Sequence, residues 1–497
     1  ATVQAEEVFM KQARIVLGLL AVSACSTVPS MPSMPTLGGD RLVVFPIAPD
    51  APDTWAANGV VGEAPRADWL TQFDDDMLVA LVNEALAANP SIRSQYYAVE
   101  ATRAQARSTY GRPLPSLSAS GSVTGTDTYV EATDSRVSGE LYGLGLDLNW
   151  ELDLWGRLRA SINAAESDLI ASEADLASAR LSLAAQTASA WFDLNEALAQ
   201  ERVAVETYEA RTRALELTER RLSRGLSSAL DVRTARTTQA SAEASIAGQR
   251  LASQNATRRL EILLGRYPST ELEAMAELPE LGVLPPAGNP TLLLTRRPDI
   301  AAAEARVTSA GLRAEQARLA MLPSFRLTGT LSTTEDDIAD AFAPSRIAAR
   351  LVASLTAPIF NGGALDADRD AAVAQARAAV ENYAATTLTA WREVEDALAA
   401  DSLLAQQEEA QIRALEEARL AEELATRQYT NGLVSIFNLI DSQTRRLSAE
   451  SSVIAARSAR ATNRVSFHLA LGGGLPVPTP AAPVAASNNS PEEAILP

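Results

Sequence analysis

Regularly spaced glycines divide this chain into two similar halves. Three of them recur 207 residues later: Gly156, Gly225 and Gly265 are matched by Gly363, Gly432 and Gly472. Two prolines recur 208 residues later: Pro90 and Pro115 are matched by Pro298 and Pro323. Two unrelated domains have no reason to share this spacing, so the sequence predicts an internal repeat of one structural unit.

Each half contains 68 consecutive residues without glycine or proline, residues 157–224 and residues 364–431. A continuous helix of this length spans about 100 Å, because an α-helix rises 1.5 Å per residue. Apolar side chains at intervals of seven, such as Ile162, Leu169, Leu176 and Leu183, predict coiled-coil packing. Small residues on the other faces, such as Ala165, let each helix contact two neighbours.

Two segments in each half alternate apolar and polar residues. A shorter helix precedes each pair of segments, from about Asp76 to Tyr110 and from Pro298 to Met321. The apolar positions are Leu117, Ala119, Gly121 and Val123; Leu144, Leu146, Leu148 and Trp150; Phe325, Leu327, Gly329 and Leu331; and Leu351, Ala353, Leu355 and Ala357. This pattern predicts strands of about 10 residues with one lipid-facing side, as in a membrane barrel. A soluble hairpin with one solvated face has the same local pattern.

Four such strands cannot close a barrel, because small membrane barrels have at least about eight. Open strand edges in lipid leave backbone groups unpaired at a cost of several kcal/mol each. Several chains must therefore pool their strands, and the residues alone allow two, three or more subunits.

Composition excludes several classes of function. The formal net charge of −19 disfavours nucleic acid as a partner. The chain has one cysteine, Cys25, and one histidine, His468, too few for a Cys/His zinc site. We expect no metal site, no catalytic residues and no cofactor beyond a covalent lipid. His468 lies in the apolar run VSFHLAL, and we interpret it as structural.

The N-terminal region reads as a processing signal. Met10, the expected start, is followed by two basic residues and an apolar stretch that ends in Val22-Ser23-Ala24-Cys25. This ending resembles a bacterial lipobox, in which the cysteine is lipidated and becomes the new N-terminus. Ser26 is similar to an outer-membrane sorting signal. A free cysteine in an ordinary secretory signal is the alternative.

Two longer segments resemble one known family. Leu294 to Gly329, LTRRPDIAAAEARVTSAGLRAEQARLAMLPSFRLTG, looks like the hallmark of TolC-like outer-membrane efflux lipoproteins of the NodT/OprM type. Leu148 to Asp168, LNWELDLWGRLRASINAAESD, is similar to the strand-to-helix junction of that family. The resemblance covers the chain from Cys25 to about Gly474.

The resemblance implies a mainly α fold with a transmembrane β-barrel. Long coiled-coil helices would form a periplasmic α-barrel, and each chain would contribute four strands to a shared 12-stranded barrel in a homotrimer. It also implies a periplasmic adaptor, an inner-membrane pump of the RND type, and a place in the outer membrane of a Gram-negative bacterium. The function expected is the passive exit channel of a tripartite efflux pump, and not an enzyme.

Two turns follow the long helices. Glycine permits a reversal of the backbone, and a nearby serine or aspartate caps the returning helix. The resemblance implies that both turns contact the adaptor. The residues concerned are Gly225, Leu226, Ser227 and Ser228 in the first turn, and Gly432, Leu433 and Ser435 in the second.

Asn438 and Asp441 follow the second turn, three residues apart on one helix face. The resemblance implies a periplasmic gate, where acidic rings narrow the pore. Asp441 matches an acidic position, whereas Asn438 replaces an acid with a neutral amide and weakens the field. An ordinary solvated charge is the alternative for Asp441.

The chain is expected to comprise six parts: residues 1–24, upstream residues and the signal peptide; 25–75, an extended segment; 76–267, the first repeat; 268–297, a linker; 298–474, the second repeat; and 475–497, a disordered tail. Two other functions stay open, the duct of a type I protein secretion system and a lipid-tethered periplasmic coiled-coil scaffold. Barrel-length strands disfavour the scaffold.

Overall fold

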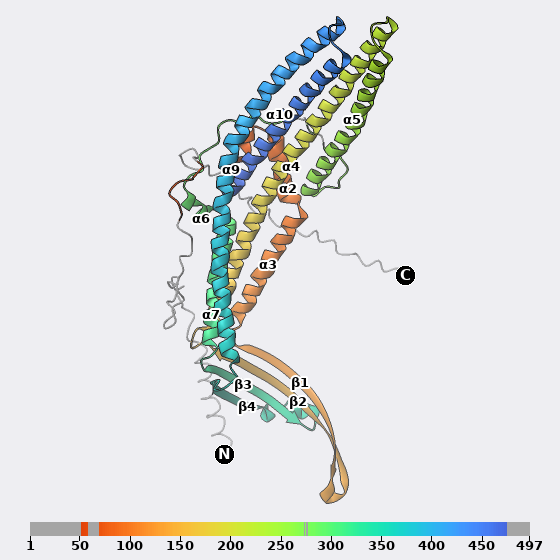
Figure 1. Ribbon diagram of the computed structural model, residues 1–497. Helices are drawn as coiled ribbons and strands as arrows, with labels where there is room; N and C mark the ends of the chain where they lie inside the picture. Colours follow the sequence, from red (N-terminus) through yellow and green to blue (C-terminus); the bar gives the residue numbers. More distant parts are fainter. Residues whose placement is uncertain (1–50, 58–68, 273, 275–276, 475–497) are drawn as a thin grey trace, which may run out of the picture. The chain divides into compact units, whose positions relative to one another are not determined.

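A computed structural model describes residues 51–57, 69–272, 274 and 277–474, all of which belong to the unit 48–497. These residues form long helices and one four-stranded antiparallel sheet (Figure 1). Within them, no helix is both long enough and apolar enough to cross a membrane. The predictions for residues 1–24, Cys25 and the tail 475–497 lie outside the described part.

The two halves have the same order of main elements. The first contains η1 (Trp69–Phe73), α2 (Asp76–Ala88), α3 (Pro90–Gly111), β1 (Ser116–Val130), η2 (Glu131–Thr133), β2 (Ser135–Leu152), α4 (Arg157–Ser223) and α5 (Ala229–Leu263). The second contains η3 (Pro290–Leu292), α6 (Leu293–Arg296), α7 (Pro298–Leu319), β3 (Ser324–Glu335), α8 (Ile338–Ala341), η4 (Pro344–Arg346), β4 (Ala348–Thr356), α9 (Ala364–Thr430) and α10 (Ile436–Ala470). Equivalent helices have equal lengths: 67 residues in α4 and α9, 35 in α5 and α10, and 22 in α3 and α7.

The predicted helix from Asp76 to Tyr110 is two helices, and the single-helix prediction was wrong. Asn89 is extended, with φ −63° and ψ 125°, as expected for a residue before proline. Its side chain accepts hydrogen bonds from the Ser91 and Ile92 amides, and its amide group donates to the Leu263 carbonyl. A capped start at Pro90 therefore separates α3 from α2.

The sheet has the order β1-β2-β3-β4, and its register confirms the predicted alternation. Leu117 pairs with Leu148, Leu148 with Gly329, and Gly329 with Leu351, which forms one apolar row across all four strands. The Leu117 and Leu351 side chains are 69% and 64% exposed in the single chain. Leu148 and Gly329, between them, are half-buried. An apolar row with exposed ends marks a surface that contacts lipid or protein.

The predicted strand length of about 10 residues was wrong for the first pair of strands, β1 and β2. β1 and β2 have 15 and 18 residues, against 12 and 9 for β3 and β4. β2 pairs with β3 only as far as Tyr142, opposite Glu335, whereas its pairing with β1 continues to Ser135. Polar contacts accompany the extra length, since Arg136 donates to Asp127 at 2.7 Å.

Helix α4 contacts most of the other long helices. Its first half packs against α3 and α7, its second half packs against α5, and α10 joins it to α9 (Figure 1). Arg103 of α3 and Arg313 of α7 bind carboxylates in the first half of α4. Of the predicted heptad positions, Leu183 is buried, whereas Ile162, Leu169 and Leu176 are half-buried in the single chain.

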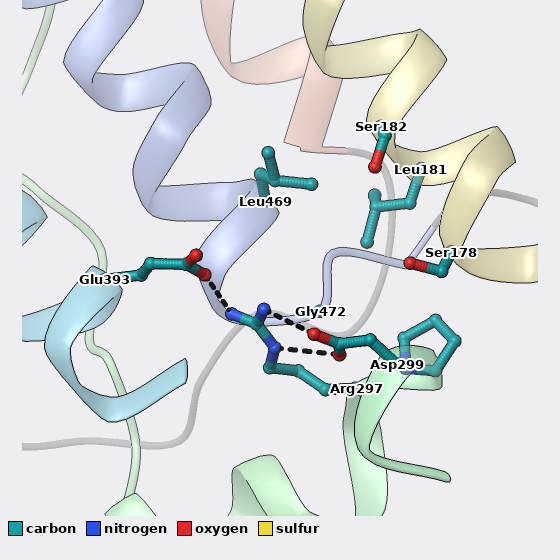
Figure 2. A pocket seen from close by; sticks show the side chains of 9 residues that line it. Ser178, Leu181, Ser182, Arg297, Asp299, Glu393, Leu469 and Gly472 are labelled. Atoms are coloured by element: carbon teal, nitrogen blue, oxygen red, sulfur yellow. Dashed lines mark hydrogen bonds and ion pairs between the residues drawn. The ribbon is translucent and has the colours of Figure 1, made fainter. Parts of the chain in front are cut away.

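Arg297 joins three helices (Figure 2). Its guanidinium donates to Asp299 of α7 at 2.8 and 3.0 Å, to Glu393 of α9 at 2.7 Å, and to the Ala470 carbonyl of α10 at 3.0 Å. Burial opposes the charge, but the two carboxylates outweigh it and raise the pKa of Arg297. The cavity beside it is small, about 150 Å³. We interpret this cluster as a structural clamp.

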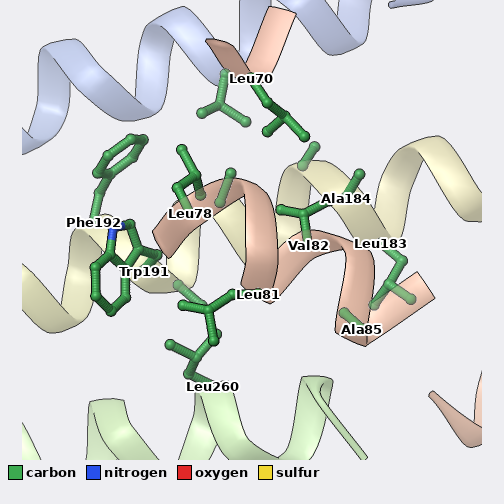
Figure 3. Packing of buried hydrophobic residues seen from close by; sticks show 14 of the residues in the cluster. Leu70, Leu78, Leu81, Val82, Ala85, Leu183, Ala184, Trp191, Phe192 and Leu260 are labelled. Carbon is green, nitrogen blue, oxygen red and sulfur yellow. The ribbon is translucent and has the colours of Figure 1, made fainter. Parts of the chain in front are cut away.

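The main apolar core lies where α2, α4, α5 and α10 meet. Figure 3 shows Leu78 of α2 next to Phe192 of α4, and Leu81 of α2 above Leu260 of α5. Phe192 and Leu260 are fully buried. Because α4 carries most of these contacts, the core fixes the shorter helices against its centre.

His468 lies at the edge of this core, which fits its expected structural role. Its ring stacks on Trp69, with centroids 5.5 Å apart, and its Nε2 lies 3.1 Å from the Gln72 side-chain oxygen. Burial, followed by the charge of Arg464, lowers the pKa of His468 to about 3. The ring is therefore neutral at neutral pH.

Acidification should weaken the fold through His468. Between pH 6.5 and about 3 the unfolded chain binds a proton on this residue and the folded chain does not. The free energy of unfolding then falls by up to about 1.4 kcal/mol for each pH unit lost. His468→Phe keeps an aromatic ring and removes this dependence, so thermal unfolding followed by circular dichroism between pH 6 and 5 should show a shallower slope than wild type. Parallel profiles would contradict this assignment.

Candidate functional site

The predicted contact residues form two neighbouring turns. The first turn, residues 224–228, joins α4 to α5, and the second, residues 431–435, joins α9 to α10. Hydrogen bonds between the ends of α4 and α9 hold the two turns together. We call them tip 1 and tip 2.

Tip 1 reverses the chain through Gly225, whose φ is +73°. The Leu226 amide donates to the Arg221 carbonyl at 2.9 Å, which closes the end of α4. Ser228 and Asp231 form a reciprocal capping box at the start of α5. The hydrogen bond from the Ser228 amide lowers the pKa of Asp231, and the Ser227 hydroxyl also donates to this carboxylate. The predicted cap at tip 1 is confirmed.

Tip 2 repeats the reversal but not the cap. Gly432 has a φ of +79°, and the Leu433 amide donates to the Gln428 carbonyl at 2.9 Å. Ser435 occupies the N-cap position but makes no capping hydrogen bond, and its hydroxyl donates to the Asn438 side chain at 2.7 Å. The expected serine cap is wrong here, because Asn438 stands where tip 1 has Asp231 and captures the hydroxyl.

Both tips expose an apolar side chain beside the glycine. Leu226 is 61% exposed and Leu433 is 74% exposed. Leucine at the end of a hairpin has no packing role in the single chain, so these two side chains are available for contact with a partner. Their contact with an adaptor stays a prediction.

Arg221 connects the two tips, and sequence reasoning missed it. Its guanidinium donates to the Tyr429 carbonyl at 2.8 Å and to the Leu226 carbonyl at 3.2 Å, and lies 4.8 Å from the centre of the Tyr429 ring. The Tyr429 hydroxyl lies 2.8 Å from the Thr218 hydroxyl in a buried contact. Tyr429, which lies shortly before Gly432, was the sequence signal that could have indicated this contact.

Arg211 lies about two to three helical turns before Arg221 on α4 and makes a second connection to the other hairpin. Sequence reasoning also missed this residue. It donates to the Gln443 and Thr444 side chains at 2.8 and 2.7 Å and to the Ile440 carbonyl at 3.1 Å. Burial lowers the pKa of Arg211, although Glu422 partly offsets this. With Arg221, it ties α4 to the second hairpin near the gate residues.

Asn438 and Asp441 both lie on α10 with exposed side chains, as their spacing predicts. Asp441 accepts a hydrogen bond from Arg445 of the same helix at 2.8 Å. Sequence reasoning overlooked this partner, although the spacing of four residues is typical of helical ion pairs. The arginine reduces the negative field that Asp441 presents, and the gate role stays a prediction.

Metal ligands are not grouped in the described ranges: no three or more His, Cys, Asp or Glu side chains there are placed to hold an ion. The predicted lipidation residue, Cys25, lies outside these ranges. The site therefore consists of two exposed hairpin ends, an arginine link between them and an exposed acidic position.

Removal of the Arg221 link should loosen tip 2 from tip 1. Gln428 occupies the equivalent position in α9, so Arg221→Gln is compatible with the helix. Loss of its charge-assisted hydrogen bonds should cost about 2 kcal/mol locally. Hydrogen exchange of residues 425–435 should accelerate in this variant. Arg220→Gln, which changes the exposed neighbour, is the matched control, and equal exchange in both variants would rule out the link.

Known proteins match the chain over both halves. The sequence model of a family described as outer membrane efflux protein matches residues 81–266 and 289–473. The cation efflux system protein CusC of Escherichia coli is 31% identical over 421 residues, which cover 84% of this chain and 91% of CusC. The toluene efflux pump outer membrane protein TtgC of Pseudomonas putida is 31% identical over 453 residues, covering 88% of this chain and 93% of TtgC.

A solved structure of the outer-membrane channel OprN agrees with these matches. It superposes with a TM-score of 0.77 and 29% identity, covering 86% of this chain and 99% of OprN. The resemblance expected from Leu294–Gly329 and Leu148–Asp168 is thereby confirmed. The chain belongs to the outer membrane efflux protein family.

Proposed function

We propose that this protein is the outer-membrane exit channel of a tripartite efflux pump, which conducts substrates passively from the periplasm to the outside. The observation that carries the proposal is the apolar row across β1–β4, which is exposed at its two ends, Leu117 and Leu351. A leucine face of this kind is unfavourable in water and favourable against lipid. The family membership and the named relatives support the same function.

Closure of the sheet requires other copies of the chain. Among the described strands, β1 and β4 each have one paired neighbour, so both outer edges are open. Lipid cannot satisfy these backbone groups. We propose that β1 of one subunit pairs with β4 of the next and that three subunits form a 12-stranded barrel. The number three comes from the family resemblance.

The helices have two open edges as well. α9 lies at one edge of the helical layer, and α5 and α3 lie at the other. Exposed apolar residues follow both edges: Leu403, Leu420 and Leu424 on α9, and Leu251 and Ile262 on α5. Packing of α9 against α5 and α3 of the next subunit would cover them and close a periplasmic α-barrel.

The remaining parts of the proposal concern partners. A passive tube supplies no energy, so an inner-membrane RND-type pump must drive transport, and a periplasmic adaptor would contact Gly225, Leu226, Ser227 and Ser228 and also Gly432, Leu433 and Ser435. Lipidated Cys25 would anchor each chain in the outer membrane. CusC is named for cations and TtgC for toluene at the same identity, so the family likeness does not select the cargo.

The proposal is tested on full-length protein extracted in mild detergent. Unheated samples should migrate in electrophoresis as trimers that heating converts to monomers. Reconstitution in planar bilayers should give discrete single-channel currents, and the intact mass should show acyl chains on an N-terminal Cys25. A monomer without conductance before heating would disprove the channel.

Loss of the Asp441 carboxylate should alter ion selection. Three symmetry-related copies of this side chain would attract cations at the narrow end of the pore. Asp441→Ala should lower the cation preference and raise the open probability in bilayer recordings. Asp396→Ala is the matched control, because Asp396 is also exposed and paired with an arginine four residues away, Arg392. Identical selectivity in the two variants would assign Asp441 to an ordinary solvated charge.

A further inference from the structure

The apolar face of the sheet, which carries the row from Leu117 to Leu351, extends further in the first half of the chain than in the second. On β1 and β2 its last apolar row pairs Val123 with Tyr142. On β3 the same row ends in Glu335, and β4 does not reach it. At this row the strands of the second half therefore supply no apolar side chain.

Helix α8 lies on the apolar face at the end of β3. Side chains alternate along a strand, so Thr333 shares this face with Gly329. The Thr333 hydroxyl donates to the Ala341 carbonyl at 2.8 Å, and both residues are buried. α8 packs mainly against β2 and β3, the two inner strands. The helix thus covers the apolar face at the point where the strands of the second half stop.

The single turn of α8 has an apolar side and a charged side. Ile338 and Phe342 lie four residues apart, so they share one side, and they are 57% and 69% exposed. Asp340 lies midway between them in the sequence and therefore on the opposite side, where it pairs with Arg346 at 3.8 Å. An apolar side next to a charged side is typical of segments that lie at a membrane surface.

Local contacts fix this segment. Asp337 caps α8, since its carboxylate accepts a hydrogen bond from the Ala339 amide at 2.8 Å. Arg346 also pairs with Glu335 at 3.8 Å, which ties the far end of the segment to β3. The two exposed apolar side chains therefore project from an ordered surface and lie largely outside the packing of the single chain.

We propose that α8 is a lipid anchor in the outer leaflet, which places Ile338 and Phe342 among acyl chains at the row of Val123 and Tyr142. The inference rests on the proposed function, which sets the apolar face in a membrane. The β3–β4 connection lies on the outer side in that setting, because β3 follows α7 and β4 precedes α9. The inference goes further by assigning a lipid contact outside the strands and by fixing the row at which lipid contact ends.

Lipid fits this surface better than a neighbouring copy of the chain does. A neighbour would join the sheet at its edges, β1 and β4, whereas α8 packs on the inner strands. Beyond Val123 the same face of the sheet carries Asp127 and Glu140, which are poor partners for an apolar side chain. The inference therefore commits to acyl chains, and contact with another subunit is an outcome of the test.

Photocrosslinking in vesicles tests the anchor. p-Benzoylphenylalanine is incorporated in place of Phe342, Leu351 or Tyr129 in the full-length protein, which is reconstituted in dioleoyl phosphatidylcholine vesicles and irradiated. Leu351 reports on the apolar row itself. Tyr129 is the matched control, because it is an aromatic residue on the same face of β1, is 55% exposed and lies beyond Val123. Mass spectrometry then measures the fraction of each protein that carries a lipid adduct.

The Phe342 position should form lipid adducts as readily as the Leu351 position. Its yield should exceed that of the Tyr129 position by at least about tenfold, because transfer of a phenylalanine-sized side chain from water to lipid is favoured by at least this factor. Equal yields at Phe342 and Tyr129 would overturn the inference, and so would crosslinks from Phe342 to another subunit in place of lipid. Lipid adducts at Leu351 without adducts at Phe342 contradict only this inference, whereas a lack of adducts at Leu351 contradicts the proposed function.

Discussion

The rest of the structure depends on a sheet that its own chain cannot complete. β1 and β4 end the described sheet with open edges, and the row from Leu117 through Leu148 and Gly329 to Leu351 gathers apolar residues on one face. Backbone groups at such edges need partners in lipid, and only other strands can supply them. The helical layer has the same property, since apolar side chains on α9 and α5 are exposed at its two edges. The proposed closure by neighbouring subunits would satisfy both requirements at once.

Arginine holds the two halves of the chain together where the core ends. Apolar packing between α2, α4 and α5 fixes the middle of the molecule. Arg297 clamps α7, α9 and α10 at that level. Towards the tips, Arg211 and Arg221 of α4 bind backbone and side-chain oxygens of α10 and α9. Hydrogen bonds of this kind can break and re-form more readily than a packed core.

Much of the fold follows from local sequence rules. Absence of glycine and proline predicted α4 and α9, and period-two alternation predicted the four strands and their apolar faces. The break at Asn89 was missed because a helix through Pro90 satisfied the same apolar pattern. The length of the β1–β2 extension was missed because its polar residues carry no lipid-facing signal. Arg211 and Arg221 were missed because their partners lie more than 200 residues away, and the ion pair of Asp441 with Arg445 was local but overlooked.

Electron cryomicroscopy of the detergent-extracted, full-length protein tests the closure of the sheet most directly. The account predicts particles with three-fold symmetry in which β1 of each subunit is hydrogen-bonded to β4 of the next, so that twelve strands surround a continuous pore. Particles that contain a single chain, or assemblies in which β1 and β4 stay uncovered, would contradict it.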